Sequence, residues 1–451
     1  MPEDLWAFLP LIHERNNRQM SPLTADSQLQ IGIEIEFVAP RNVEWEDEHL
    51  PDLDHWNHVS LSKDACFHRL AVALHDAGLP ACYQMKTTPL RCVRNPLREA
   101  APSRSLVLGS VYRLLGDPTR FHNSRRRRGD NGRAGLYRYW LVKGEYNLTD
   151  DARYKTWIAC ELNTPILSEV DMAGATLPDL DTALTALHGT YDSAPHISTR
   201  RCGLHVHLSP VSGGTLFFAQ RILTLALLLD QTLLSPLCDP SRKDLGRPFL
   251  SAAALSTRRD LVVPRMPALS AAARAHLPRQ FAAVEGRVLS CIWRAETFDD
   301  LQQILEHHSA DLLTVAPVLC KHKLAAVDGG EDNTTTTTVE FRHAQASFSS
   351  RFVRAWASVV LAIGRVGLLG VEEYKHALGR LWDAGMGSRS RDPEQTCLAT
   401  LEVLSEAAVE AGMLGGGLDL GYWRTRCAQM REGQNPDVDG EGKVVLDADG
   451  Q

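Results

Sequence analysis

The sequence predicts an α+β protein in which a domain built around β-strands is followed by a helical C-terminal region. Segments such as 29–38 and 202–208 alternate between apolar and polar residues, which is typical of strands. Segments such as 61–77 have helical spacing, and the pattern is helical throughout from 371 to 413. With 451 residues, of which 44% are hydrophobic, the chain can form one large domain, although length alone also permits two or three smaller ones.

The predicted elements follow one another along the chain. The strands are expected at 29–38, 136–142, 156–162, 202–208 and 339–342. The helices are expected at 61–77, 179–187, 216–234, 297–308 and 352–366. Gly78 is a suitable stop for the first helix, and Thr297 with Asp300 approximates a capping box at the start of the fourth.

Composition shifts divide the chain into four parts. These are an N-terminal segment at 1–28, a main domain at 29–370 with a polar insertion at about 96–135, a helical region at 371–431, and a tail at 432–451. Within the insertion, the arginine run 125–128 is expected to be a solvated surface loop. The tail is rich in Gly and Asp and is expected to be disordered. It imitates a calcium-binding loop, but Ala448 stands where the bidentate Glu should be, so we reject that interpretation.

The bulk properties exclude several classes of protein. A formal charge of −7 over this length gives no reason to expect nucleic acid or a membrane surface as a partner. The first 20 residues lack the features of a secretory signal, and the longest apolar run, 222–229, is too short to span a bilayer. The ten cysteines include no CxxC pair and are expected to be free thiols. We therefore expect a cytoplasmic protein.

Three of the predicted strands carry a pair of polar side chains on one face. Residues two apart on a strand point to the same side, so each pair shares a face opposite to apolar neighbours. The pairs are Glu34 with Glu36, His205 with His207, and Glu340 with Arg342. Any one pair alone is also consistent with an amphipathic strand whose outer face is solvated.

The combination of the three pairs indicates a metal site. Two carboxylates roughly 6–7 Å apart repel by about 2–3 kcal/mol at an effective dielectric of ~20, and a bound divalent cation removes that cost. If the strands are neighbours, their carboxylates and imidazoles converge on one surface. A set rich in oxygen ligands suits Mg²⁺ or Mn²⁺ better than a structural zinc ion. Cys202 lies near the histidines in sequence, but strand parity turns it away from them.

No glycine loop of the P-loop type, GxGxxG, HExxH or GxSxG motif occurs in the chain. An ATP-using enzyme with this sequence would therefore hold the phosphates with metal ions and arginines.

These motifs resemble those of the amidoligase family, which is placed with glutamine synthetase and glutamate–cysteine ligase among the carboxylate–amine ligases. The segments 32–37, 202–207 and 339–342 are similar to its three characteristic strands. A fourth segment, containing Trp140, Glu145 and Glu161, also resembles the family pattern, and Arg242 is similar to a further family arginine. The resemblance extends over about residues 29 to 370.

The resemblance implies a curved antiparallel sheet with helices on its outer face, as in the catalytic domain of glutamine synthetase, and ATP and Mg²⁺ (or Mn²⁺) as cofactors. One metal would be shared by Glu34, His205 and Glu340 and would contact ATP. The other would be shared by Glu36 and Glu161, near the substrate carboxylate. The remaining implied roles are phosphoryl contacts from His207 and Arg342, cofactor binding by Arg242, and proton acceptance by Glu145 or Glu161.

The implied activity is the formation of an amide bond through an acyl-phosphate, from a small-molecule or peptide carboxylate and an amine. The sequence departs from the family pattern where Glu145 replaces an aspartate, where Asn163-Thr164 precedes the proline, and where Asp328 replaces an asparagine. Two alternatives remain: a metal-dependent hydrolase that uses the same cluster to activate water, and a non-catalytic binding module on a degenerate ligase fold. The presence of all six polar-pair residues argues against the second.

Overall fold

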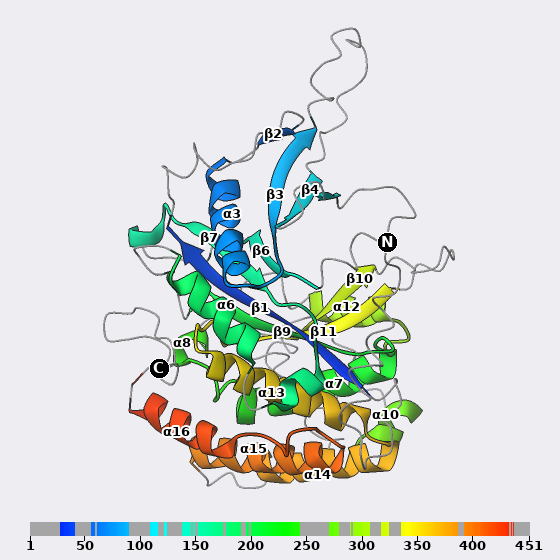
Figure 1. The fold of residues 1–451 in the computed structure, drawn as a ribbon. Helices are drawn as coiled ribbons and strands as arrows, with labels where there is room; N and C mark the ends of the chain where they lie inside the picture. Colours follow the sequence, from blue (N-terminus) through cyan, green and yellow to red (C-terminus); the bar gives the residue numbers. More distant parts are fainter. Residues whose placement is uncertain are drawn as a thin grey trace, which may run out of the picture.

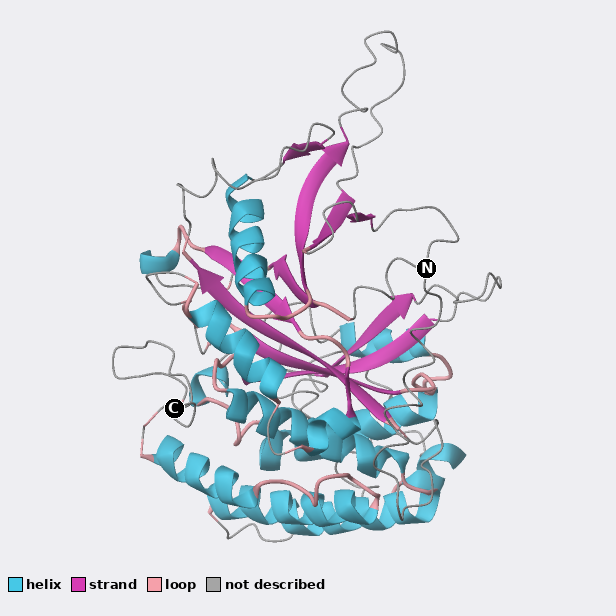
Figure 2. Ribbon diagram, viewed as in Figure 1, coloured by secondary structure: helices cyan, strands magenta, loops and turns pink. Residues whose placement is uncertain are grey.

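The computed structural model describes residues 28–40, 56–58, 61–89, 109–115, 121–123, 138–145, 148, 152–174, 177–190, 195–197, 200–243, 270–278, 289, 292–306, 317–323, 335–386, 392–432, 434 and 436. These residues form an α+β fold with a single mixed β-sheet (Figures 1 and 2). The predicted α+β class is confirmed.

The described strands join into one 11-stranded sheet. They are β1 (Leu29–Ala39), β2 (Trp56–His58), β3 (Ala81–Pro89), β4 (Gly109–Leu114), β5 (Phe121–Asn123), β6 (Trp140–Gly144), β7 (Ile158–Asn163), β8 (Leu167–Ser168), β9 (Gly203–Pro210), β10 (Pro317–Lys323) and β11 (Thr335–Gln345). Their order is β10-β11-β9-β1-β7-β6-β3-β4-β5, with β2 beside β3 and β8 beside β1. The strands β11, β9, β1 and β7, which carry the predicted site residues, are therefore consecutive neighbours.

The sheet is mixed, because β3 pairs with β6 in parallel whereas the other strand pairs are antiparallel. The expectation of a wholly antiparallel sheet is therefore wrong at this one pair. A parallel pair requires a crossover connection, and here the chain passes through β4 and β5 before it returns as β6. Residue alternation identifies a strand but carries no information about its direction relative to a neighbour.

The helices lie on one side of the sheet and extend away from it (Figure 1). Their bounds are α3 (Leu61–Asp76), α5 (Glu169–Ala173), α6 (Pro178–His188), α7 (Leu216–Leu229), α8 (Pro240–Lys243), α10 (Ala271–His276), α12 (Phe298–Glu306), α13 (Ser350–Leu368), α14 (Val371–Met386), α15 (Pro393–Glu410) and α16 (Leu420–Arg431). A short 3-10 helix (Ala152–Tyr154) and a π-helical turn (Asp230–Leu234) complete the described elements.

Helix α13 covers the apolar face of β1 and β9. The aliphatic residues of β1 are fully buried on this face, and α13 approaches them closely at Gly364. A Cβ atom at this position would lie 2.9 Å from side-chain atoms of both Leu29 and Leu208. Such a contact would require both leucine side chains to shift, so glycine lets α13 pack this closely on the sheet without that displacement. Because α13 occupies the apolar face, the polar pairs lie on the opposite face.

Helices α14, α15 and α16 form a further layer beyond α13 (Figure 1). Trp423 of α16 packs edge-on against Phe352 of α13, with ring centroids 6.2 Å apart. The guanidinium of Arg426 lies 4.0 Å from the centroid of the same Phe352 ring. The helical C-terminal region was predicted correctly, and its buried residues belong to the same hydrophobic core as the sheet. This region therefore supports the helix on which the sheet rests.

Part of the expected polar insertion at 96–135 forms β-strands, because β4 and β5 lie within it and extend one edge of the sheet. The arginine run 125–128 and the segment 1–27 lie outside the described residues, as does the tail beyond 436. Helix α7 and the π-helical turn together, Leu216–Leu234, are long and apolar enough to cross a membrane, but 67% of this window is buried inside the fold. A buried helix in a protein core can have the same length and hydropathy as a membrane span, so this finding is only weak evidence for a span.

Candidate metal centre

The polar pairs meet because the register of the central strands aligns them. The directly opposed residues are Glu34 with His205, Glu36 with Glu161, and Glu340 with His207. Directly opposed residues share a face of the sheet and have neighbouring Cβ atoms. The structure thus brings together all of the carboxylates and imidazoles that the sequence singled out.

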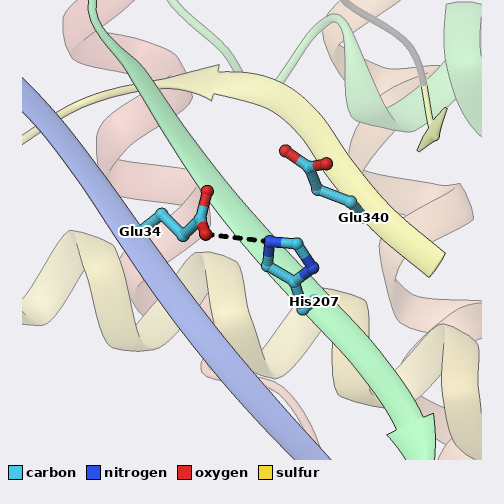
Figure 3. Close-up of side chains that lie close together, drawn as sticks. All are labelled: Glu34, His207 and Glu340. Carbon is cyan, nitrogen blue, oxygen red and sulfur yellow. Dashed lines mark ion pairs between the residues drawn. The ribbon is translucent and has the colours of Figure 1, made fainter. Parts of the chain in front are cut away.

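The first ligand group consists of Glu34, His207 and Glu340, one residue from each of β1, β9 and β11 (Figure 3). One potential ligand atom from each residue lies within 4.8 Å of the other two. His207 Nε2 is 3.3 Å from Glu34 Oε1, and its Nδ1 is 3.2 Å from the Thr338 hydroxyl. Thr338 therefore orients the ring so that Nε2 points toward the carboxylates.

His205 lies between the two groups and is buried. Its Nδ1 is 3.2 Å from Glu340 Oε1 and 3.5 Å from Glu34 Oε2, and its Nε2 is 3.7 Å from Glu36 Oε1. The resemblance implied that His205 shares a metal with Glu34 and Glu340 while His207 contacts the phosphoryl group. The structure places both imidazoles beside these carboxylates, with His207 in the compact group.

The second ligand group consists of Glu36, Glu145 and Glu161, again with one atom of each within 4.8 Å of the others. Glu36 Oε2 accepts a 2.6 Å hydrogen bond from the Gly203 amide, which fixes one of its oxygens. A Cβ at Gly203 would lie 2.4 Å from a ring nitrogen of His205, so only glycine leaves room for this arrangement. Glu145, which the resemblance implied as a proton acceptor, thus lies among potential metal ligands.

Lys143 is a residue of the centre that the sequence reasoning missed. It lies on β6 directly opposite Glu161, and its Nζ is 2.7 Å from Glu161 Oε1 and 3.7 Å from Glu34 Oε1. The same Glu161 oxygen accepts a hydrogen bond from the Asn163 amide. Lys143 therefore contacts one carboxylate from each ligand group. Its position two residues before Glu145 could have indicated a shared strand face, but a lone lysine on a strand is ordinarily a solvated residue.

The two carboxylates that face the histidines are stabilised in the ionised form. Burial alone would raise the pKa of Glu34, but the charges of His207 and Lys143 and hydrogen bonds from both histidines hold it well below the usual value. Burial likewise opposes ionisation of Glu340, and His207, His205 and Arg342 lower its pKa. Both carboxylates are therefore ready to act as anionic ligands at neutral pH.

Glu161 behaves differently because it is buried beside another carboxylate. Burial and the charge of Glu34 raise the pKa of Glu161 well above its usual value, although Lys143 and Asn163 act in the opposite direction. Burial would lower the pKa of Lys143, but Glu34, Glu161 and Glu145 raise it beyond the usual range. Lys143 is therefore a permanent cation within a set of carboxylates that repel one another.

A β-bulge on β11 sets the position of Arg342. Phe341 pairs with Val206 and Ala344 pairs with Leu204, so β11 has one extra residue over this interval. Bulges of this kind redirect side chains next to functional sites. The side chain of Arg342 is 30% exposed, and its Nη1 lies 3.1 Å from Glu340 Oε1. The guanidinium thus stands at the β11 end of the row of carboxylates.

Arg242 stabilises this bulge through hydrogen bonds to its main chain. Its guanidinium is buried and donates four hydrogen bonds to backbone carbonyls, those of Arg200, Cys202, Arg342 and His343, at 2.9 to 3.3 Å. The resemblance implied a role in cofactor binding for Arg242. The structure instead shows four of its N–H donors bound to the main chain, and two of these bonds go to the carbonyls of Arg342 and His343 within the bulge.

The donor atoms fit a pair of hard divalent cations. Ligands of an octahedral magnesium ion are about 2.1 Å from the metal and hence at most about 4.2 Å from one another. The potential ligand atoms of each group lie within 4.8 Å of one another, which is close to this spacing. Carboxylate oxygens with one imidazole are a ligand set that Mg²⁺ and Mn²⁺ accept. Cys202 is buried on the opposite face, among the apolar core residues, as the parity argument predicted.

The fold and the centre together define an α+β protein with two carboxylate-rich groups on one face of its sheet. The chain matches no protein family, no curated protein and no solved structure with which it was compared.

Proposed function

We propose that the chain is an ATP- and Mg²⁺-dependent carboxylate–amine ligase that forms an amide bond through an acyl-phosphate. The observation that carries this proposal is the meeting of two ligand groups on one sheet face, with a guanidinium at one end and an ammonium at the other. Phosphoryl transfer depends on positioning and on compensation of the charge spread over the phosphoryl oxygens. A centre that offers two cation positions and two fixed positive charges supplies both.

In this proposal the first ligand group and His205 would hold a cation that serves the ATP phosphates, and the second group would hold a cation that serves the substrate carboxylate. The bound cations would neutralise phosphate charge and orient the reacting groups. Arg342 binds the transferring phosphoryl group, because the planar guanidinium donates two parallel hydrogen bonds to phosphate oxygens. Attack by the carboxylate oxygen on the γ-phosphorus breaks the bond to the β-phosphate oxygen and releases ADP.

The second half-reaction requires a proton acceptor for the amine. The amine attacks the acyl carbon, the bond to the phosphate oxygen breaks, and the nitrogen loses a proton. Each residue of the second group offers one ligand atom, so we assign this proton to the other carboxylate oxygen of Glu145, which is only half-buried, whereas Glu36 and Glu161 are buried. A carboxylate at the edge of the centre can reach an amine that approaches from solvent.

The proposal includes membership of the amidoligase family and a sheet related to that of glutamine synthetase. It is supported by the order of β11, β9, β1 and β7 in the sheet and by the packing of α13 on the apolar face of β1 and β9, opposite the polar pairs. The substrates are a small-molecule or peptide carboxylate and an amine.

Hydroxylamine trapping provides the test. The purified chain is incubated with ATP, Mg²⁺, hydroxylamine and a panel of amino acids, dicarboxylates and short peptides, and hydroxamate and ADP are measured. We expect hydroxamate formation in step with ADP release for at least one acid, and none without ATP. Hydrolysis of panel peptides without nucleotide would instead assign the centre to a metal-dependent hydrolase.

A further inference from the structure

Lys143 is the one residue whose side chain contacts both ligand groups from the β6 side of the described sheet. Its Nζ lies 2.7 Å from Glu161 Oε1 and 3.7 Å from Glu34 Oε1. Glu161 is almost completely buried, with 3% of its side chain exposed, so the ammonium is its main source of positive charge in the absence of a metal. A divalent cation at the second ligand group would therefore lie next to an existing cation.

The formal charge of the centre shows how the Lys143 ammonium affects the binding of a second cation. A bound cation holds its carboxylate ligands in the ionised form, and this includes Glu161, whose pKa is raised in the absence of a cation. With all five carboxylates of the two groups ionised, five negative charges and the two positive charges of Lys143 and Arg342 leave a formal charge of −3. One divalent cation changes this charge to −1, and a second changes it to +1. Excess positive charge is unfavourable here, because several of these groups are buried and little water screens them.

We propose that Lys143 is a built-in cation that prevents the second ligand group from holding a divalent cation until an anionic ligand enters the centre. Without the ammonium, two divalent cations and Arg342 together would balance the five carboxylates, and the formal charge would be zero. With it, the second cation binds tightly only when a polyphosphate or carboxylate ligand supplies further negative charge. Binding of the second cation and of the anion then becomes cooperative.

Lys143 can also contact that anion. An ammonium has three N–H donors. The Lys143 Nζ lies within hydrogen-bond distance of Glu161 Oε1, at 2.7 Å, whereas Glu34 Oε1, at 3.7 Å, is only an ion-pair partner. The side chain is 27% exposed, so an anion that enters from solvent can reach the ammonium. The inference rests on the metal centre of the proposed function and not on the ligase chemistry.

Manganese binding measures the effect directly, by calorimetry and by the electron paramagnetic resonance signal of free Mn²⁺. We expect the wild-type chain to bind one Mn²⁺ tightly without nucleotide and two in the presence of the imido analogue of ATP. Lys143→Met should bind two ions without nucleotide, with the second bound at least about tenfold more tightly than by the wild type. Lys143→Arg, which keeps the charge, should behave like the wild type.

Two controls locate the effect. Lys155→Met removes the same charge from an exposed position on the turn before β7 and should leave the stoichiometry unchanged. Glu145→Gln in the Lys143→Met background should return it to one ion. If Lys143→Met fails to fold, as judged by circular dichroism, Lys143→Gln takes its place.

The inference is overturned if the wild-type chain binds two ions equally tightly without nucleotide, or if neutral variants bind the second ion no more tightly. These comparisons need no nucleotide, so they do not depend on the ligase assignment. An imido-ATP analogue that fails to change Mn²⁺ binding would count against coupling to a nucleotide and against the proposed function, while leaving the effect of the Lys143 charge on the second ion as a separate result.

Discussion

Arg242 donates a 2.9 Å hydrogen bond from Nη2 to the main-chain oxygen of Arg342, so one buried arginine holds the backbone that presents the other. The two residues lie 100 positions apart in the chain. This relationship separates a supporting arginine from one that faces the ligands, and it predicts opposite consequences for substitutions at the two positions.

Substitution of Arg242 should weaken the fold. Arg242→Met removes four hydrogen bonds to main-chain carbonyls, two of them at the bulge and two just before β9, and we expect the free energy of unfolding in urea to fall by about 2–4 kcal/mol. Arg424→Met, at an exposed position on α16, should change it by less than about 0.5 kcal/mol. An Arg242→Met variant as stable as the wild type would show that the carbonyls are satisfied without the guanidinium.

Substitution of Arg342 should affect turnover more than stability. Arg342→Lys keeps the charge but loses the two-pronged donor geometry, so we expect kcat to fall roughly a hundredfold or more once the substrates are known. Its melting temperature should change little. Phe341→Ala is the contrasting control, because this fully buried aromatic should cost about 3–5 kcal/mol. If Arg342→Lys melts as early as Phe341→Ala, Arg342 serves the fold.

Stability should depend on the protonation of His343. Burial and the charge of Arg242 lower the pKa of His343 to about 3. The unfolded chain binds this proton at about pH 6.5 and the folded chain does not, so stability should fall as the pH decreases below 6.5, by up to about 1.4 kcal/mol per pH unit from this group.

Urea unfolding at pH 6.5, 5.75 and 5 measures this slope above the range in which Asp and Glu titrate. His343→Gln should flatten it by close to one proton, whereas His376→Gln, at an exposed position on α14, should not. An unchanged slope in His343→Gln would mean that His343 becomes protonated in the folded state.

Divalent cations should stabilise the folded chain. Mg²⁺ or Mn²⁺ at about 100 times its dissociation constant should raise the free energy of unfolding by about 2.7 kcal/mol, since the unfolded chain lacks the assembled ligands. Glu340→Gln should abolish most of this gain in thermal melts, because it removes a ligand of the first group. Glu372→Gln, at an exposed position, is the matched control. Equal stabilisation of both variants would place the cation elsewhere.

The arginine run 125–128 should be dispensable. It lies outside the residues that the structure describes and outside the four motif segments. Replacing the four arginines with alanine should leave the melting temperature and any ATP turnover nearly unchanged. A large loss of nucleotide affinity would instead assign the run to phosphate binding.

The sequence by itself identified the strands β1, β6, β7, β9 and β11, and for the three that carry polar pairs it also determined which side each residue faces. The other described strands of the sheet, β2, β3, β4, β5, β8 and β10, were not predicted. Alternation placed Glu34 with Glu36 and His205 with His207, because the two-residue period of a strand is a local property. Hydrophobic spacing likewise identified α3, α6, α13 and α15. The antiparallel sheet was only an implication of the family resemblance, and the neighbours of each strand in the sheet were not predicted. The candidate ligands could therefore be named before their contacts were known.

The tertiary structure decided the strand pairing, the bulge and the contacts of Lys143 and Arg242, none of which is contained in a local sequence pattern. The parallel pairing of β3 with β6 depends on the path of the chain between them, and it brings Lys143 on β6 opposite Glu161. The bulge at Arg342 depends on a one-residue mismatch between β11 and β9, which appears only when the strands pair. Lys143 compensates the charge of carboxylates, and Arg242 donates to carbonyls, that are close in space but mostly distant in sequence. The roles of these two residues could therefore be recognised only in the assembled sheet.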